Sequence, residues 1–192
     1  MKPAFSSTRK IERGTTLVEL MVAMFMLTVG MGAMLVLFMN STVSNNRNVR
    51  DTSSTLLAQM VLEQINSQHI NSNAAIVVTD CTGVQWTVAT AGGAAPNGAG
   101  ANLDQNANSL TYGGIDQTQA YNAIPANYAM RYTDCDPNGQ QAVYEVRWNV
   151  ITITANSTRL ITVSARQANV NSNQLGGARF AAPVTLRGVA GT

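Results

Sequence analysis

The sequence predicts an α+β fold in which a long N-terminal α-helix, membrane-spanning in its first half, packs on a small antiparallel β-sheet head. Three observations predict it. An uncharged apolar run of twenty residues extends from Leu20 to Met39. Apolar residues then recur with helical spacing between Leu56 and Ile65. From Ala74 onward the apolar period changes to two, which is typical of half-buried antiparallel strands.

The apolar run has the length and the flanking charges of a membrane anchor. Twenty helical residues extend about 30 Å, the thickness of the hydrocarbon core of a bilayer. The first fourteen residues carry a net charge of +3, whereas residues 15–192 carry −1 and contain no lysine. Because positive flanks stay in the cytoplasm, we expect residues 1–14 to be cytoplasmic and everything after Met39 to be exported.

Two simpler kinds of segment share some of these features. A cleaved secretory signal peptide has about 7–15 apolar residues and a small-x-small cleavage site, but this run is longer and Met39–Thr42 matches such a site poorly. A plain signal anchor fits the length and stays open, but it leaves Glu19 unexplained. An unpaired carboxylate at this edge costs up to about 2.5–3.5 kcal/mol, depending on its depth. Glu19 is therefore expected to have a partner.

The stretch from Arg13 to Leu20, read as RGTTLVEL, follows a short basic leader and precedes the apolar run. This arrangement resembles the class III signal of type IV pilins and type II secretion pseudopilins. The resemblance implies that a prepilin peptidase cleaves between Gly14 and Thr15 and N-methylates Thr15. It also implies that Glu19 sets assembly register by pairing with the N-terminal ammonium of a neighbouring subunit. Thr15 departs from the family, which usually has Phe or Met there.

The predicted helix continues beyond the membrane. Leu56, Leu57, Met60, Val61 and Ile65 form one helical face, so we expect one stem from Leu17 to about Ile70. The expected division of the chain is a leader (1–14), a helix (15–72) with its transmembrane part at about 17–39, and a β-rich head (73–192).

The softest part of the predicted helix lies inside the membrane-spanning run, at Gly30 and Gly32. Each Gly costs about 1 kcal/mol relative to Ala in a water-exposed helix. Local melting there during filament assembly is one hypothesis, and close packing of small residues between membrane helices is the other.

Two strands of the head are predicted by alternation, one from Ala142 to Val150 and one from Leu160 to Arg166. In the first strand Tyr144, Val146 and Trp148 are expected to face the core. The turn residues 155–158 between the strands indicate a hairpin. Shorter strand candidates are Ala74–Thr79, Val84–Thr90, Ser109–Gly113 and Tyr128–Tyr132. Residues 91–108 are rich in Gly, Ala and Asn and are expected to form a surface loop.

The only two cysteines, Cys81 and Cys135, both follow the apolar run and are therefore expected outside the cytoplasm. An even pair in an oxidising compartment favours a disulfide. Closing a loop of about 54 residues would stabilise the head by about 4 kcal/mol before strain is counted.

The sequence contains no pattern that supports catalysis. His69 is the only histidine, and neither a phosphate-binding loop nor a G-x-S-x-G motif is present. We therefore expect no enzyme activity, no cofactor and no metal. Nucleic acid is not an expected partner either, because the arginines are scattered over a mature chain of net charge −1.

These features together indicate a minor pilin-like subunit, inserted in the inner membrane and then incorporated into a type IV filament, where it aids pilus assembly or adhesion. The segment Leu56–Asn66 and the strand pair around Trp148 resemble PilV-type minor pilins and pseudopilins of the I type. Expected partners are the prepilin peptidase, other pilins through their N-terminal helices, the inner-membrane assembly platform and membrane lipid. A type II secretion pseudopilin and a membrane-anchored periplasmic binding module are the alternatives.

Overall fold

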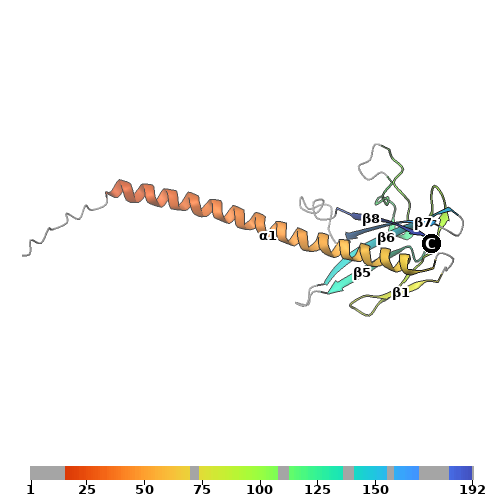
Figure 1. Cartoon of the computed structure of the whole chain (residues 1–192). Coiled ribbons are helices and arrows are strands. Elements are labelled where there is room, and N and C mark those ends of the chain that lie inside the picture. The colour runs from red at the N-terminus through yellow and green to blue at the C-terminus, as the bar shows by residue number, and fades with distance from the viewer. Residues whose placement is uncertain are drawn as a thin grey trace, which may run out of the picture. The chain divides into compact units, whose positions relative to one another are not determined.

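We analysed a computed structural model of the chain, shown in Figure 1. It describes residues 16–69, 74–107, 113–135, 141–154, 158–168 and 182–191. The chain divides into two compact units, one up to Asn45 and one from Asn46 onward. A single helix, α1 (Leu17–Ser67), supplies residues to both units. The predicted boundary between helix and head falls between residues 72 and 73, which lie outside the described residues.

In the first unit, residues 17–45 of α1 are all exposed. α1 is unbroken through Gly30 and Gly32 in the single chain, and nothing lies within 4 Å of where a Cβ would stand on either glycine. The hydroxyl of Thr28 donates to the carbonyl of Phe25 (2.8 Å), and that of Thr42 donates to Met39 (2.8 Å). The hydroxyl of Thr28, inside the apolar run, is therefore satisfied within the helix, as a segment that crosses lipid would require.

In the second unit, α1 contributes one buried stripe to the core of the head. Leu57, Ala58, Val61 and Ile65 are buried and belong to the same cluster as the sheet residues. Their spacing of three and four residues aligns them on one side of the helix. Leu56 was predicted on this face but is 59% exposed. At about 100° per residue, the buried stripe extends from Leu57 round to Ala58, and Leu56 lies about 100° beyond its Leu57 edge.

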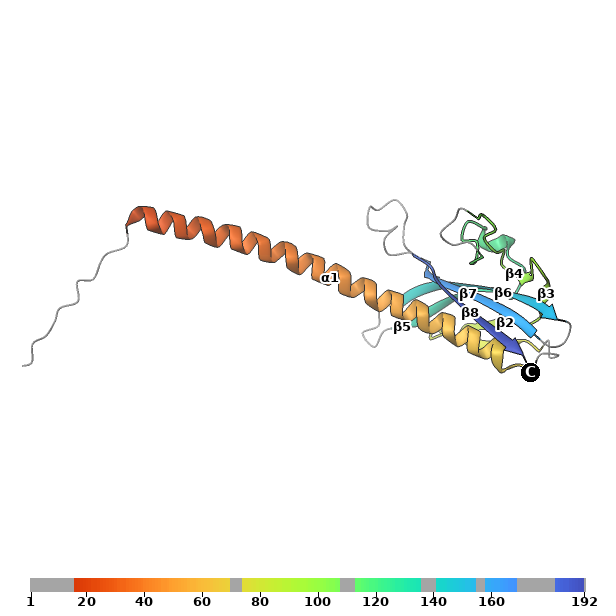
Figure 2. The same ribbon diagram turned by 45° about the horizontal axis from the view of Figure 1, so that its top comes forward.

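The sheet of the head has six strands in a mixed arrangement, and a separate two-stranded sheet lies beside it. Figures 1 and 2 show the last part of α1 along one face of the larger sheet. All pairings are antiparallel except that of β3 with β6, which is parallel. The elements after α1 are β1 (Ile76–Thr79), β2 (Gln85–Val88), β3 (Gly93–Ala94), β4 (Ala99–Gly100), the 3-10 helix η1 (Tyr121–Ala123), β5 (Ala129–Cys135), β6 (Gln141–Thr154), β7 (Thr158–Gln167) and β8 (Val184–Gly191).

The central hairpin of β6 and β7 confirms the two strands that were predicted from alternation. Tyr144, Val146 and Trp148 are buried, and Trp148 pairs with Val163 across the hairpin. The indole Nε1 of Trp148 donates to the carbonyl of Ala89 (2.9 Å). The predicted turn at 155–158 lies outside the described residues except for Thr158, which begins β7. The predicted fold class, a long helix on a β-sheet head, is confirmed.

The opposite face of β6 was expected to meet solvent, and this expectation was wrong. Glu145, Arg147 and Asn149 on that face are all buried. Arg147 and Asn149 are covered by the described parts of residues 97–119, drawn in green above the sheet in Figure 2. Nη1 of Arg147 donates to the carbonyl of Gln119 (2.7 Å). Nδ2 of Asn149 donates to the carbonyls of Asn97 and Ala101 (both 2.8 Å).

Charged groups on this covered face are paired with one another. Arg147 forms an ion pair with Glu145, and Arg166 lies 3.2 Å from the same carboxylate oxygen. A buried charge without a partner is strongly destabilising, so the pairing is what allows charged residues on this face. Alternation alone predicts the face of a residue but not what covers that face.

Residues 91–108 were expected to form a surface loop, but the described part of this segment is attached to the sheet. It contains β3 and β4, both paired with β6, and Ala101 is fully buried. Gly100 has φ +114°, and a Cβ there would collide with the carbonyl of Trp148 and the ring of Tyr128. Glycine is therefore required where the segment approaches β6, since its lack of a side chain permits the contact.

Of the shorter strand candidates, three correspond to β1, β2 and β5, with β5 extending to Cys135. Ser109–Gly113 lies outside the described residues except for Gly113, which is not in a strand. β8 was not predicted. Apolar and polar residues alternate in its sequence only as far as Leu186. Beyond it, Gly188 faces the helix and Val189 is 65% exposed, so the hydrophobic pattern no longer marks the inner face.

Candidate functional site

The described part of the predicted signal begins with a reciprocal hydrogen-bond motif between Thr16 and Glu19. Oε2 of Glu19 accepts from the backbone N–H of Thr16 (3.2 Å) and from its hydroxyl (3.3 Å). In return, the backbone N–H of Glu19 donates to Oγ1 of Thr16 (3.3 Å). This is a capping box, in which a Thr at the N-cap and a Glu three positions later satisfy each other's backbone donors.

The capping box gives Glu19 a local partner before any second subunit is present. The carboxylate lies at the start of α1, where the partial positive charge of the helix dipole favours an anion. Thr16 was not singled out from the sequence, although the T-x-x-E spacing before an apolar run is the recognised signal for this motif. Part of the cost of a carboxylate at the membrane edge is thus offset within the chain.

Gly14 and Thr15, the residues of the predicted cleavage, lie outside the described residues. The structure therefore brings together only Thr16 and Glu19 from the signal. Thr16 directly follows the expected new N-terminus, so the Glu19 carboxylate is held one residue from the position where the terminal amine would be created.

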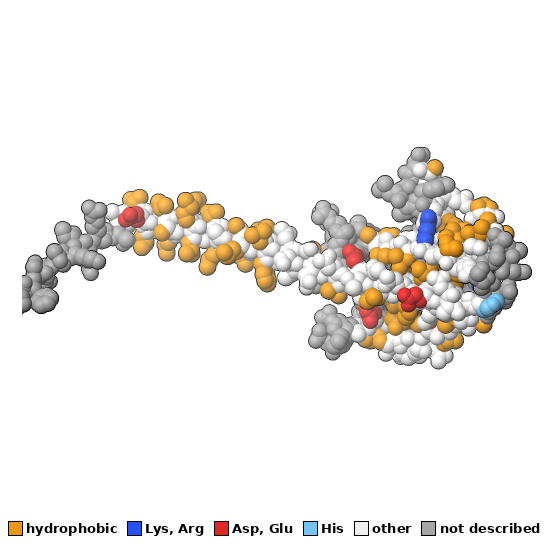
Figure 3. Space-filling view, in the orientation of Figure 1, with side chains coloured by type: hydrophobic (Ala, Val, Ile, Leu, Met, Phe, Trp, Pro, Cys, Tyr) orange, Lys and Arg blue, Asp and Glu red, His pale blue; other side chains and the backbone are white. Residues whose placement is uncertain are grey.

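Between Leu20 and Met39, exposed apolar side chains occur at nearly every position of α1 and therefore on all its sides. Figure 3 shows hydrophobic side chains along the visible face of this part of the helix, with acidic atoms at its start. Leu20, Phe25, Leu37 and Phe38 are each more than half exposed. Among the described residues, α1 is the one helix long and apolar enough to cross a membrane. A surface of this extent requires lipid or other helices around it.

The predicted disulfide is present. Cys81 and Cys135 are bonded, with their Cα atoms 5.9 Å apart. The bond joins the turn after β1 to the last residue of β5, and the N–H of Cys81 also donates to the carbonyl of Thr133 (3.4 Å). It therefore fastens the small sheet to the edge of the larger one.

Asp80, immediately before the disulfide, organises the β1–β2 turn. Oδ1 accepts from the hydroxyl of Thr82 (2.7 Å), from its N–H (2.9 Å) and from the N–H of Val84 (3.0 Å). Oδ2 accepts from the indole of Trp86 (3.2 Å). The Thr82 hydroxyl first, and then Trp86 and the two backbone donors, lower the pKa of Asp80 from 3.8 to about 2 against the opposing effect of desolvation.

Asp80→Asn is expected to lower the melting temperature of the head at pH 7 and to flatten its dependence on acid. Because the pKa of Asp80 is lower in the folded chain, its contribution to stability is complete above about pH 3.8 and is lost as the pH falls towards about 2. Thermal unfolding of the purified chain between pH 7 and pH 2, followed by near-UV circular dichroism, measures this. The variant and the wild type should converge near pH 2.

Glu63→Gln, at an exposed position of α1, makes the same change in net charge and is the matched control. Equal acid sensitivity of the wild type and Asp80→Asn would contradict the role assigned to Asp80.

No group of three or more His, Cys, Asp or Glu side chains suitable for a metal ion occurs among the described residues. His69 was expected in the last turn of the helix, but α1 ends at Ser67 and His69 follows it. It is exposed, as Figure 3 also indicates by a pale blue group on the head.

Comparison with known proteins identifies the N-terminal segment. Residues 9–35 match the family described as the Prokaryotic N-terminal methylation motif. This range includes the predicted cleavage position, the Thr16–Glu19 capping box and most of the apolar run, as far as Leu35. No curated protein and no solved structure matches the chain.

The class III signal implies processing by a prepilin peptidase and assembly with other pilins, and the helix that it begins implies anchoring in the inner membrane before assembly. Pilins have a structural rather than an enzymatic role. The matched motif, the long apolar helix and the α+β head with its Cys81–Cys135 disulfide together make the chain a type IV pilin-like protein that carries a prepilin N-methylation motif.

Proposed function

We propose that the chain is a minor pilin-like structural subunit of a type IV filament. Prepilin peptidase removes residues 1–14 by cleavage between Gly14 and Thr15, and Thr15 is N-methylated. Residues 17–39 then hold the subunit in the inner membrane, with the rest of the helix and the head (73–192) outside the cytoplasm. From there the subunit is lifted into the growing filament.

The observation that carries the proposal is the position of the methylation motif at the start of a membrane-length helix. The side chains of that helix are exposed as far as Asn45. In the membrane lipid covers them, and in a filament the helices of neighbouring subunits take its place. The apolar surface is thus suited to both environments, whereas water would be unfavourable for it.

Glu19 is proposed to change partners during assembly. In the single chain its carboxylate is occupied by Thr16. In the filament it pairs with the N-terminal ammonium of a neighbouring Thr15, an interaction strengthened by the low dielectric between apolar helices. Because only one axial position brings the two charges together, the pair sets the register of the subunit.

A minor rather than a main subunit is proposed on three features of the chain. These are the polar residue Thr15 at the expected mature N-terminus, the long mature chain and the strand pair around the buried Trp148. The corresponding alternative is a pseudopilin of a type II secretion system, which would push a substrate instead of forming a surface fibre. A chain found in secretion pseudopili and absent from surface fibres would favour that alternative.

A membrane-anchored periplasmic binding module is the alternative from another class, and processing separates it from a pilin. Co-expression with an active prepilin peptidase should convert the chain to a form shorter by the leader. Immunoblotting with an antibody against the head should show the shift, and a catalytically inactive peptidase should give none. Persistence of the full-length form with the active peptidase would contradict the proposal.

A further inference from the structure

A pocket on the head lies between β2 and the segment that leads into β5. Its volume is about 360 Å³, within the range of roughly 300–1,000 Å³ typical of small-molecule sites. We call it the Trp86 pocket. Its aromatic and polar lining residues are Gln85, Trp86, Thr87, Tyr121, Asn122 and Asn127.

The lining of the Trp86 pocket combines aromatic rings with neutral polar side chains. Trp86 and Tyr121 offer ring surfaces, while Gln85, Asn122 and Asn127 offer amides. An amide both donates and accepts hydrogen bonds, so it matches hydroxyl groups, which do the same. None of the described residues that line the pocket is charged. This chemistry suits a neutral ligand with many hydroxyls and an apolar C–H face.

The two aromatic residues are held in place by contacts with Asp80, Arg131 and Ala129. The indole of Trp86 donates to Asp80, whose turn is fastened by the disulfide. The guanidinium of Arg131 lies 4.4 Å from the centre of the Tyr121 ring, and the Tyr121 hydroxyl donates to the carbonyl of Ala129 (3.4 Å). Rings that are already fixed lose little conformational entropy when a ligand binds.

Backbone hydrogen bonds on either side of β2 join its hairpin to β5 and to the segment that leads into β5. On one side the N–H of Ala89 donates to the carbonyl of Asn127 (2.9 Å), and on the other the N–H of Cys81 donates to Thr133 (3.4 Å). Asn127 has φ +66°, a left-handed conformation that Asn tolerates better than most residues.

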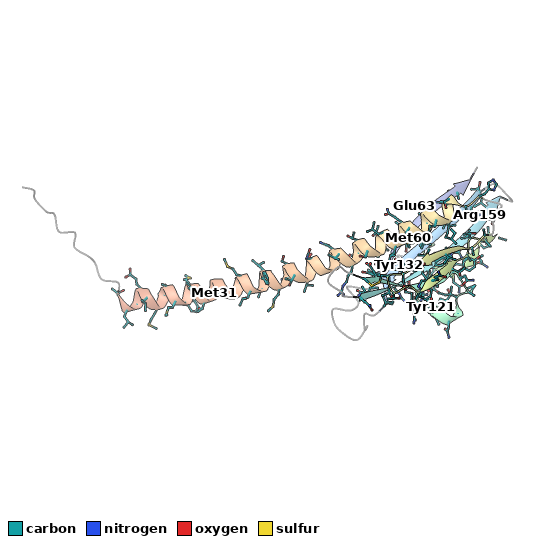
Figure 4. The ribbon with its side chains drawn as sticks, turned by 90° about the horizontal axis from the view of Figure 1, so that it is seen from below. Met31, Met60, Glu63, Tyr121, Tyr132 and Arg159 are labelled. Carbon is teal, nitrogen blue, oxygen red and sulfur yellow. A yellow bond between two sulfur atoms is a disulfide. The ribbon has the colours of Figure 1, made fainter. Side chains whose placement is uncertain are left out.

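We propose that the Trp86 pocket binds a neutral saccharide, with the sugar stacked on Trp86 and Tyr121 and its hydroxyls bound by Gln85, Asn122 and Asn127. This site is independent of cleavage and of filament assembly. Figure 4 shows Tyr121 on the side of the head away from Met60 and Glu63 of α1. The pocket is therefore not on the face of the head where α1 carries Met60 and Glu63.

Titration of the full chain with saccharides tests the proposal. The chain is kept in a zwitterionic detergent without a sugar headgroup, and the probes are glucose, galactose, mannose, N-acetylglucosamine, lactose and chitobiose. Of the two tryptophans, Trp148 is fully buried, so a change in fluorescence reports on Trp86. Saturation-transfer NMR on the sugar protons detects binding that leaves the fluorescence unchanged. N-acetylneuraminic acid and glucuronic acid form the acidic comparison set.

At least one neutral saccharide should bind saturably. Asn122→Ala, an exposed position in the pocket, should weaken that binding by about tenfold, the effect of losing one good hydrogen bond. Asn106→Ala removes an exposed amide outside the pocket and should leave the affinity unchanged. The proposal would be overturned if neither method detected binding of any neutral saccharide, or if only the acidic sugars bound. Equal affinity of Asn122→Ala and the wild type for the saccharide would also overturn it.

Discussion

Replacement of Glu19 by Val is expected to reduce incorporation of the chain into filaments at least tenfold while leaving membrane insertion intact. Valine is apolar, so the anchor becomes slightly more favourable in the bilayer. The neighbouring ammonium, however, would be left without a partner between apolar helices. Removing one member of such a buried pair costs about 3–5 kcal/mol. The measurement is the ratio of the chain in sheared filaments to the chain in membranes.

Two further variants separate the two roles of the Glu19 carboxylate. Glu19→Gln keeps the capping box, because Gln at this position can also accept from the N-cap backbone, but it removes the charge. Thr16→Val keeps the charge and removes the hydroxyl that bonds with Glu19. We expect Glu19→Gln to behave like Glu19→Val. Thr16→Val should lose only about 1 kcal/mol of helix-cap stability and should still be incorporated.

The opposite result would be normal incorporation of Glu19→Gln into filaments and no incorporation of Thr16→Val. The capping box would then be the essential feature, and the proposed ion pair between subunits would be wrong. Comparable amounts of each variant in the membrane fraction provide the control for expression and insertion.

Loss of the disulfide is the second change with a large expected effect. The bond closes a sequence separation of 54 residues, and replacing both cysteines by serine should destabilise the head by about 4 kcal/mol. For a domain of this size, the loss corresponds to a decrease in melting temperature on the order of 10 °C. Because the Asp80 turn adjoins Cys81, the environment of Trp86 should also change before the rest of the head unfolds.

Denaturant unfolding of the full chain in detergent, followed by near-UV circular dichroism, measures the difference. Treating the wild type with a thiol reductant should reproduce the double variant, and the same treatment should leave the double variant unchanged. A difference below about 1 kcal/mol between the oxidised wild type and the double variant would contradict the assigned role.

Local patterns in the sequence were sufficient to predict the parts of the fold that depend on them. The helix follows from the uncharged run and from the spacing of Leu57, Val61 and Ile65, and the β6–β7 hairpin follows from strict alternation around Trp148. The disulfide could be predicted because only one pairing of two cysteines exists. The capping box of Thr16 and Glu19 was also readable from its spacing, although only Glu19 was recognised.

The remaining features depend on contacts between segments distant in sequence. Nothing local to Arg147 indicates that the carbonyls of Asp116 and Gln119 cover it. The segment with β3 and β4 is attached through backbone groups, and its small residues carry little hydrophobic pattern. The Trp86 pocket joins β2 to residues 121–129, so its chemistry becomes visible only when the chain is folded.

The state of the N-terminus in purified filaments tests the central claim most directly. Filaments are sheared from cells that express the chain, and the chain recovered from them is analysed by mass spectrometry of its N-terminal peptide. The account predicts that the chain is present in this fraction and begins with N-methylated Thr15. A chain that is confined to the membrane and retains residues 1–14 would contradict it.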